Sequence, residues 1–310
     1  MSEDAIQAAA RALAAGQLVI LPTETVYGLA ADAGNAQAVA ALFEAKGRPR
    51  FNPLIAHVAT VEAAERLAVF DEAARALARA FWPGPLTIVA PARADGGVCD
   101  LARAGLDSVA VRVPGHPVAR AVLAAFAGPV VAPSANRSGR PSPTTFADAV
   151  EETGPSAATA LDGGPCDVGV ESTVVSVLDG RVALLRPGAV TRDQIEALVG
   201  PLTTDQDGAA EGHRSPGRLT LHYAPDAPVR IDAQGASDGE ILLGFGPGVG
   251  DPRWSLSVTG DVREAATNLF RLLREADREH PVGIAVSPVP LAGLGEAIND
   301  RLRRAAGFVG

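Results

Sequence analysis

A single lysine stands at the start of a short basic segment. The chain contains 27 lysine and arginine residues in total; Lys46 is the only lysine, and Arg48 and Arg50 follow it closely. The lysine ammonium is a compact point charge and the arginine guanidinium a planar fork, so the two are not interchangeable where geometry matters. This segment is either a clamp for a polyphosphate or a solvated basic turn, and taken alone it favours neither.

Two further segments place hydroxyl and charged side chains directly after predicted strands. The run 22–29 (PTETVYGL) contains Thr25, and the run 131–140 (VAPSANRSGR) contains Ser134 and Asn136. Ligands of open α/β sheets bind beyond the carboxyl ends of strands, which suits a polar substrate. Turns capped by their own side chains are the competing interpretation. Ser134 lacks the G-x-S-x-G context of a nucleophile, so we expect it to donate or accept hydrogen bonds.

Two arginines interrupt apolar strand patterns. Arg112 lies in 109–114 (VAVRVP), and Arg186 ends a predicted hairpin. A buried arginine without a partner is costly, so each is expected to face an anion or an acid. An anionic ligand and a structural ion pair both fit these positions. The segment 169–173 (GVEST) enters the same hairpin and adds Ser172 to the candidate hydroxyls.

The elements that must position these residues alternate between strands and helices, which predicts an α/β fold. Asp179-Gly180 between two apolar runs predicts a hairpin, so the sheet is expected to be mixed. Thr191 and Gln194 form a predicted capping box. The expected strands are 18–21, 54–58, 86–90, 109–113, 130–132, 174–178 and 182–185, and the expected helices are 4–15, 35–45, 71–81, 117–126, 144–152 and 191–198.

The composition changes after Gly200. A polar, glycine-rich stretch without periodicity predicts a linker, and strands at 229–231, 241–245 and 282–286 with helices at 262–279 and 294–306 predict a small second α/β domain. We expect a first domain over 1–202, a linker that also acts as a lid over 203–227, and an accessory domain over 228–310.

Composition excludes several classes of function. The net charge of −9 argues against broad binding to a nucleic-acid backbone, and no apolar run reaches the ~20 residues of a membrane span. Cys99 and Cys166 are far apart, and the five histidines form no zinc-like set. With no signal peptide visible, these features predict a cytoplasmic protein without disulfides or a structural metal. No Walker A or G-x-G-x-x-G phosphate loop is present.

Seven separated segments together resemble the YrdC-like family, and in particular its long two-domain threonylcarbamoyl-AMP synthases. They are PTETVYGL, KGRPRFNPLIAHV, FWPGPLT, GLDSVAVRVP, APSANRSGRPSPT, GVESTVVSV and LLRPG, in that order. After them, SPG and LHYAP resemble the interdomain linker of the family, and GLGEAINDR the end of its accessory domain. The resemblance implies a twisted mixed sheet around a large concave basic groove, followed by a Rossmann-like domain.

The family implies a nucleotidyltransferase that converts L-threonine, bicarbonate and ATP, with Mg²⁺, to threonylcarbamoyl-AMP and pyrophosphate. Its product feeds threonylcarbamoyladenosine modification of tRNA by downstream transferase proteins. Carried over by motif, Lys46 and Arg48 are the expected catalytic cations. The ATP-binding set is Lys46, Arg48, Asn52, Ser108, Ser134, Asn136, Ser142, Arg186 and Tyr223; the threonine-binding set is Thr25, His57, Arg112, Ala132 and Ser172. Ser108 stands where relatives often have threonine and keeps the hydroxyl.

Two other functions fit parts of the sequence. A carbamoyl-transfer maturation module could share the fold, but such proteins carry zinc-finger segments, and no Cys-x-x-Cys pair occurs here. An RNA-binding protein could use a basic concavity, but the acidic net charge and the lack of interleaved aromatic residues oppose it. We therefore expect small-molecule substrates, no stable nucleic-acid binding and no membrane association.

Overall fold

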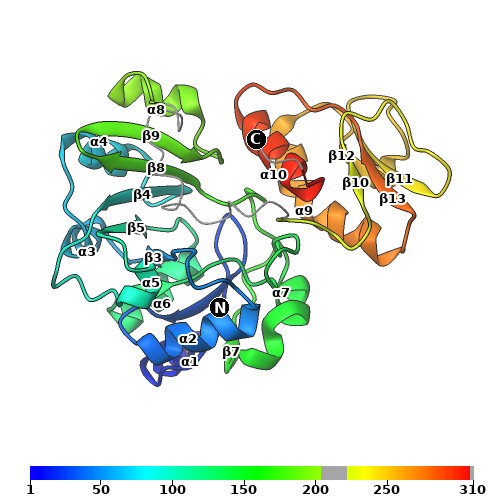
Figure 1. The fold of residues 1–310 in the computed structure, drawn as a ribbon. Helices are drawn as coiled ribbons and strands as arrows, with labels where there is room; N and C mark the ends of the chain where they lie inside the picture. The colour runs from blue at the N-terminus through cyan, green and yellow to red at the C-terminus, as the bar shows by residue number, and fades with distance from the viewer. Residues whose placement is uncertain (204–221, 308–310) are drawn as a thin grey trace.

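A nine-stranded sheet organises the first part of the chain (Figure 1). The computed structural model describes residues 1–203 and 222–307. The strand order is β7-β1-β2-β6-β3-β5-β4-β8-β9, with both parallel and antiparallel neighbours, which confirms the predicted mixed sheet. The strands are β1 (Val19–Leu21), β2 (Gly28–Asp32), β3 (Ile55–His57), β4 (Leu86–Pro91), β5 (Ser108–Arg112), β6 (Val130–Val131), β7 (Thr159–Ala160), β8 (Thr173–Leu178) and β9 (Arg181–Arg186).

Helices pack against this sheet through their apolar stripes. Leu13 of α1 and Leu123 of α6 pack with Leu21 of β1, whereas Leu42 of α2 packs with Ile20 in a separate cluster. Alternate residues of a strand point to opposite faces, so the two clusters lie on opposite sides of the sheet. The helices are α1 (Glu3–Ala14), α2 (Ala36–Lys46), α3 (Val61–Leu67), α4 (Glu72–Phe81), α5 (Asp100–Arg103), α6 (Pro117–Phe126), α7 (Phe146–Thr153) and α8 (Arg192–Val199), with a 3₁₀ turn at Gly154–Ser156.

Strand alternation also sets which face of β5 can carry a site. Val109 and Val111 pack under α3, α4 and α8 in one apolar cluster. Ser108, Ala110 and Arg112 therefore share the opposite face of the strand. Arg112, the charged side chain that was predicted to need a partner, lies on this face.

Three local predictions are confirmed. Asp179 and Gly180 form the hairpin turn between β8 and β9, both with positive φ as such a two-residue turn requires. Thr191 and Gln194 form both halves of the capping box of α8. Lys46 is the last residue of α2, and Gly47 ends that helix in the left-handed conformation.

The second domain is a four-stranded parallel sheet in the order β10-β13-β11-β12, which fits the expected Rossmann-like fold. Its two long helices lie on the side facing the first domain (Figure 1). The elements are β10 (Val229–Arg230), β11 (Glu240–Phe245), β12 (Ser255–Ser257), β13 (Gly283–Val286), α9 (Val262–Arg278) and α10 (Leu294–Ala305), with a 3₁₀ turn at Pro252–Trp254.

The two domains meet in part through apolar side chains. Val26 and Val170 of the first domain belong to the same buried cluster as Leu269 and Phe270 of α9. Gly169 lies so close to α9 that a Cβ there would stand 2.3 Å from Thr267 Cα, a contact that only glycine permits. The loop that enters β8 therefore rests directly on the second domain. No helix in the described ranges is long and apolar enough to cross a membrane.

Candidate active site

A pocket opens between the first sheet and the start of the second domain. Its walls combine arginines with hydroxyl and aromatic side chains from segments far apart in the sequence. Nine of the fourteen residues predicted for the site line it: Thr25, Arg48, His57, Arg112, Ala132, Ser134, Ser172, Arg186 and Tyr223. The pocket thus brings together predicted residues that range along the chain from Thr25 to Tyr223.

Arg112 lines the pocket and is almost fully buried. Its Nη2 pairs with Glu24 Oε1 at 2.6 Å, its Nη1 donates to the Thr25 hydroxyl at 3.0 Å, and its Nε donates to the Gly84 carbonyl at 3.2 Å. A guanidinium has five N–H groups, so these contacts leave one on each Nη. Arg112 is thus held rigidly with a pair of donors still available for a carboxylate.

His57 lies beside Arg112, one strand away in the parallel β3–β5 pair. Its Nδ1 is 3.1 Å from the Ile55 carbonyl, so the ring is held with that nitrogen as donor. Burial, and then the neighbouring Arg112 guanidinium, lower the pKa of His57 to about 3. The imidazole is therefore neutral near pH 7 and can accept a hydrogen bond through Nε2.

Arg186 and Arg48 also line the pocket and form a second group of positive charge, in which burial, and then the charge of Arg186, lower the pKa of Arg48. Arg186 donates from Nε and Nη2 to the Ser172 carbonyl at 3.1 and 2.9 Å, and from Nη2 to the Ser172 hydroxyl at 3.2 Å. The Ser172 hydroxyl is also 2.8 Å from that of Thr87. Ser172 therefore links the arginine to strand β4 of the sheet.

Lys46 does not line this pocket but lies just behind its wall, 3 % exposed. Its Nζ donates to the carbonyl oxygens of Ser134 and Asn136. Burial, and then the charge of Arg48, hold the pKa of Lys46 well below its usual range. In this conformation the lysine supports the loop 134–142 from beneath, with one of its three N–H groups uncommitted.

The other predicted residues outside the lining are buried near it: Asn52, Ser108, Asn136 and Ser142. The Asn136 amide donates to the carbonyls of Arg137 and Arg140 at 2.8 and 2.9 Å, and the Ser142 hydroxyl donates to Glu171. Asn136 and Ser142 thus shape the loop in this conformation instead of facing the pocket.

The end of the predicted lid segment fills the pocket mouth. His222 and Tyr223 both line the pocket and are 6 % and 1 % exposed. The Tyr223 ring packs on Phe270 of α9, with ring centres 5.3 Å apart. The space left in the pocket is about 50 Å³, far below the roughly 300 Å³ of a small ligand site. Most of the predicted lid, residues 204–221, lies outside the described part.

Sequence reasoning missed two acids of the site. Glu24 orients Arg112; burial acts to raise the pKa of Glu24, but the Arg112 charge and backbone hydrogen bonds together hold that pKa below its ordinary value. Glu171 lines the pocket, and Arg301 and Arg186 keep its pKa low, again against burial. Glu24 lies in the motif PTETVYGL and Glu171 in the motif GVEST. A charged residue inside an otherwise buried motif was therefore the sequence signal that could have identified both acids.

Known proteins resemble the chain over nearly its whole length. The sequence model of a family described as "Telomere recombination" matches residues 11–188, and that of "Threonylcarbamoyl-AMP synthase, C-terminal domain" matches residues 190–307. The threonylcarbamoyl-AMP synthase of Bacillus subtilis is 38 % identical over 97 % of this chain and 93 % of its own. The chain belongs to the threonylcarbamoyl-AMP synthase family, in its long two-domain form.

A solved member of this synthase family has the same fold. In the crystal structure of Pyrococcus abyssi Sua5 complexed with L-threonine, the protein is 38 % identical in sequence to this chain. The two structures superpose with a TM-score of 0.90, and the match covers 99 % of this chain and 96 % of the relative. By contrast, a putative threonylcarbamoyl-AMP synthase of Mycobacterium tuberculosis, 41 % identical, matches only 63 % of this chain but 89 % of its own length. The second domain is therefore a feature of the long synthases.

This synthase has no preformed metal site among the described residues. No group of three or more histidine, cysteine, aspartate or glutamate side chains is arranged to hold an ion there. The carboxylate that lines the pocket, Glu171, is paired with Arg301 and accepts from Ser142.

Proposed function

We propose that this chain synthesises threonylcarbamoyl-AMP and pyrophosphate from L-threonine, bicarbonate and the Mg²⁺ complex of ATP. The observation that carries this proposal is that the arginines lining one pocket fall into two groups. Arg112 is bonded to Glu24 and Thr25. Arg48 instead lies close enough to Arg186 for that charge to add to burial in lowering the pKa of Arg48. An amino acid and a nucleoside triphosphate are both anionic, and each needs its own cations. Membership of the synthase family supports the same reaction.

The Arg112 group is proposed to hold threonine. The two uncommitted N–H groups of Arg112 suit a carboxylate, and the neutral His57 and the hydroxyls of Thr25 and Ser172 suit the polar side chain and amine. Ala132 contributes its backbone at the pocket wall. The P. abyssi relative was solved with L-threonine, which supports an amino-acid subsite in this fold.

The Arg48 and Arg186 group is proposed to hold ATP. Arg48 and Arg186, together with Lys46 behind the loop, can offset the charge that develops as pyrophosphate leaves. Ser134 lies in the pocket wall for contact with the phosphates, and Tyr223 can cover the nucleotide. Asn52, Ser108, Asn136 and Ser142 complete the proposed ATP set, and Ser142 would first have to leave Glu171.

The reaction needs two bond-forming steps without a covalent enzyme intermediate. The threonine amine takes up the carbon of bicarbonate with loss of water to give a carbamate. A carbamate oxygen then attacks the α-phosphorus, and the bond to pyrophosphate breaks, which makes the enzyme a nucleotidyltransferase. In this scheme the residues act by positioning and by electrostatic stabilisation.

The product is an acyl-adenylate that water hydrolyses, so it must pass to a transferase that acts on tRNA. We propose that such transferase proteins are the partners, that the cell compartment is the cytoplasm, and that this chain does not itself hold tRNA. The net charge of −9 supports the last point, because nucleic-acid binding relies on cations that neutralise phosphates.

The test is a reconstituted reaction with ATP, Mg²⁺, L-threonine and bicarbonate, in which pyrophosphate and threonylcarbamoyl-AMP are both quantified. Omission of any one substrate should stop both products. Pyrophosphate release that does not depend on threonine would contradict the proposal, and pyrophosphate release with carbamoyl phosphate but not with threonine would point to a carbamoyl-transfer module.

A further inference from the structure

The loop 134–142, which carries several of the proposed ATP contacts, is held by more than its own hydrogen bonds. Its first half rests on Lys46, which donates to the Ser134 and Asn136 carbonyls. Its outer side is held by Glu152 of α7, whose side chain is 3 % exposed. The Glu152 carboxylate accepts from the backbone N–H of Arg137 at 3.0 Å. The form of this loop therefore depends on where Glu152 is placed.

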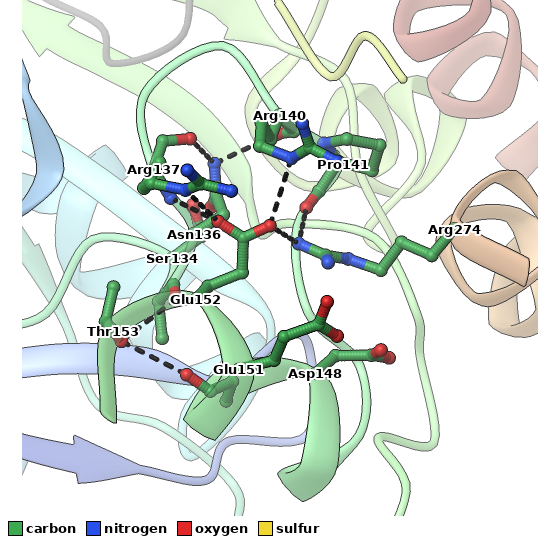
Figure 2. Close-up of polar contacts among 12 residues, drawn as sticks. Ser134, Asn136, Arg137, Arg140, Pro141, Asp148, Glu151, Glu152, Thr153 and Arg274 are labelled. Carbon is green, nitrogen blue, oxygen red and sulfur yellow. Dashed lines mark hydrogen bonds and ion pairs between the residues drawn. The ribbon is translucent and has the colours of Figure 1, made fainter. Parts of the chain in front are cut away.

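An arginine of the second domain reaches this acid. Arg274 of α9 donates from Nη2 to Glu152 Oε1 at 3.0 Å and to the Pro141 carbonyl at 2.6 Å. Figure 2 shows Arg137, Arg140 and Arg274 converging on the Glu152 carboxylate, with Arg274 arriving from the side of the second domain. A single side chain of the second domain thus contacts both the loop and the acid that shapes it.

A second arginine of that domain acts at the other end of the loop. Arg301 of α10 is fully buried, and its Nε donates to Glu171 Oε2 at 3.0 Å, while Nη1 donates to the Pro187 carbonyl at 2.7 Å. The other oxygen of Glu171 accepts from the Ser142 hydroxyl. Arg301 therefore reaches Ser142 through one carboxylate.

Stability alone is a weak reason for such pairs. The desolvation of two buried charges offsets most of their attraction, so a well-packed apolar pair would hold the domains as firmly. Arg278 shows what a plain interdomain tether looks like. It pairs with Asp148 and Glu151 of α7 while remaining 47 % exposed, and neither contact touches the loop 134–142.

We infer that Arg274 and Arg301 are positioning residues that let the second domain set the nucleotide-binding loop 134–142 of the first. This inference rests on the proposed function for its choice of ATP as the ligand. The second domain of the long synthases would then help to hold the nucleotide-binding loop in position, a role that short relatives must fill within one domain. Arg301 acts through the Glu171 carboxylate, and Arg274 acts both through Glu152 and through its direct hydrogen bond to the Pro141 carbonyl. Neither arginine lines the pocket.

The test measures ATP and threonine binding separately by calorimetry on full-length variants, alongside the melting temperature. Arg274→Gln should weaken ATP binding by roughly tenfold, the middle of the range for residues in one hydrogen-bond network, and leave threonine binding within twofold of wild type. Arg274→Lys keeps one donor and should recover part of the loss. Arg278→Ala, the matched control on the same helix, should leave ATP binding unchanged.

A double-mutant cycle separates positioning from tethering. If Arg274 acts through Glu152, the double variant Arg274→Gln/Glu152→Gln should lose less ATP affinity than the sum of the single losses. Arg301→Lys provides an independent arm at the Ser142 end, with the same preference for ATP over threonine expected. ATP affinity equal to wild type in folded Arg274→Gln and Arg301→Lys proteins would overturn the inference, as would equal losses for ATP and threonine.

The same measurements keep this inference apart from the proposed reaction. ATP binding is recorded without turnover, so a wild-type protein that binds ATP but forms no threonylcarbamoyl-AMP would contradict the reaction alone. Normal product formation by the wild type, together with unchanged ATP binding in the variants, would contradict the positioning role alone.

Discussion

Arg301 of the second domain contacts two residues that line the pocket, the acid Glu171 and the aromatic ring of Tyr223. Its Nε is 3.0 Å from Glu171 Oε2, and its guanidinium carbon is 5.5 Å from the centre of the Tyr223 ring. A cation at this distance is attracted to the ring face and to the carboxylate at once. The position of Tyr223 and the position of the second domain are therefore linked through one side chain.

Lys46 gives the first prediction. Lys46→Met keeps most of the apolar stem but removes three N–H donors, so ATP affinity should fall by roughly ten- to a hundredfold, the value of one or two charge-assisted hydrogen bonds. Lys46→Arg should also be impaired, because a planar fork cannot reach two carbonyls and a phosphate from the same buried position. Titration calorimetry with ATP measures the effect, and near-wild-type affinity in both folded variants would contradict the clamp.

The lowered pKa of Lys46 adds a second readout to that experiment. Burial disfavours the ammonium, and a bound triphosphate would favour it, so ATP binding should raise the pKa and draw in a proton at alkaline pH. Calorimetry in buffers of different ionisation enthalpy counts that proton, which should be missing in Lys46→Met.

Arg112 gives a prediction for threonine binding. Arg112→Lys keeps the charge but loses the paired donors, and Arg112→Ala loses both, so the KM for threonine should rise roughly ten- to a hundredfold in the alanine variant. The KM for ATP should change little. Glu24→Gln, which loosens Arg112 without removing it, should give a smaller rise. A larger effect on ATP than on threonine would mean that the two subsites are assigned in reverse.

His57 predicts how stability depends on pH. Its pKa is about 3 in the folded protein and 6.5 in its ordinary state, so between these values the unfolded chain binds a proton that the folded chain does not. The free energy of unfolding should therefore decrease as the pH is lowered. This one group should account for a decrease of about 2 kcal/mol from pH 7 to pH 5. Urea unfolding at several pH values tests this. In His57→Asn, whose amide can still donate to the Ile55 carbonyl, the slope should be reduced, and equal slopes would refute the assignment.

Much of the site could be predicted because its signals are local. The end of α2 at Lys46, the Asp179-Gly180 hairpin and the interrupted apolar strand at Arg112 each follow from a few neighbouring residues. Strand β2 was missed because Gly28–Asp32 contains no β-branched residue, and glycine, alanine and aspartate are all depleted in strands. Helix α5, four residues long, shows too little of the helical period.

The contacts between the domains could not be predicted. Glu152 and Arg274 are 122 positions apart, and on amphipathic helices each resembles an ordinary solvated charge. One signal was present: Arg274 comes one turn after Phe270, on the apolar stripe of α9, where a charge must find a partner. Which partner it finds depends on how two separately folded sheets dock, and no local pattern encodes that.

The last prediction concerns the lid. Tyr223 fills the pocket mouth between Phe270 and Arg301, so Tyr223→Ala should lower the free energy of unfolding by about 3 kcal/mol and open the site to water. Because threonylcarbamoyl-AMP can hydrolyse, the ratio of intact product to pyrophosphate should also fall. Tyr223→Phe keeps the ring and its packing, and should retain most of that ratio. Hydrogen exchange at residues 222–225 should be slow in wild type with ATP and threonine and fast in Tyr223→Ala. If the alanine variant matched the wild type in product ratio and in exchange, Tyr223 would not act as a lid, and the buried ring would serve only to join the domains.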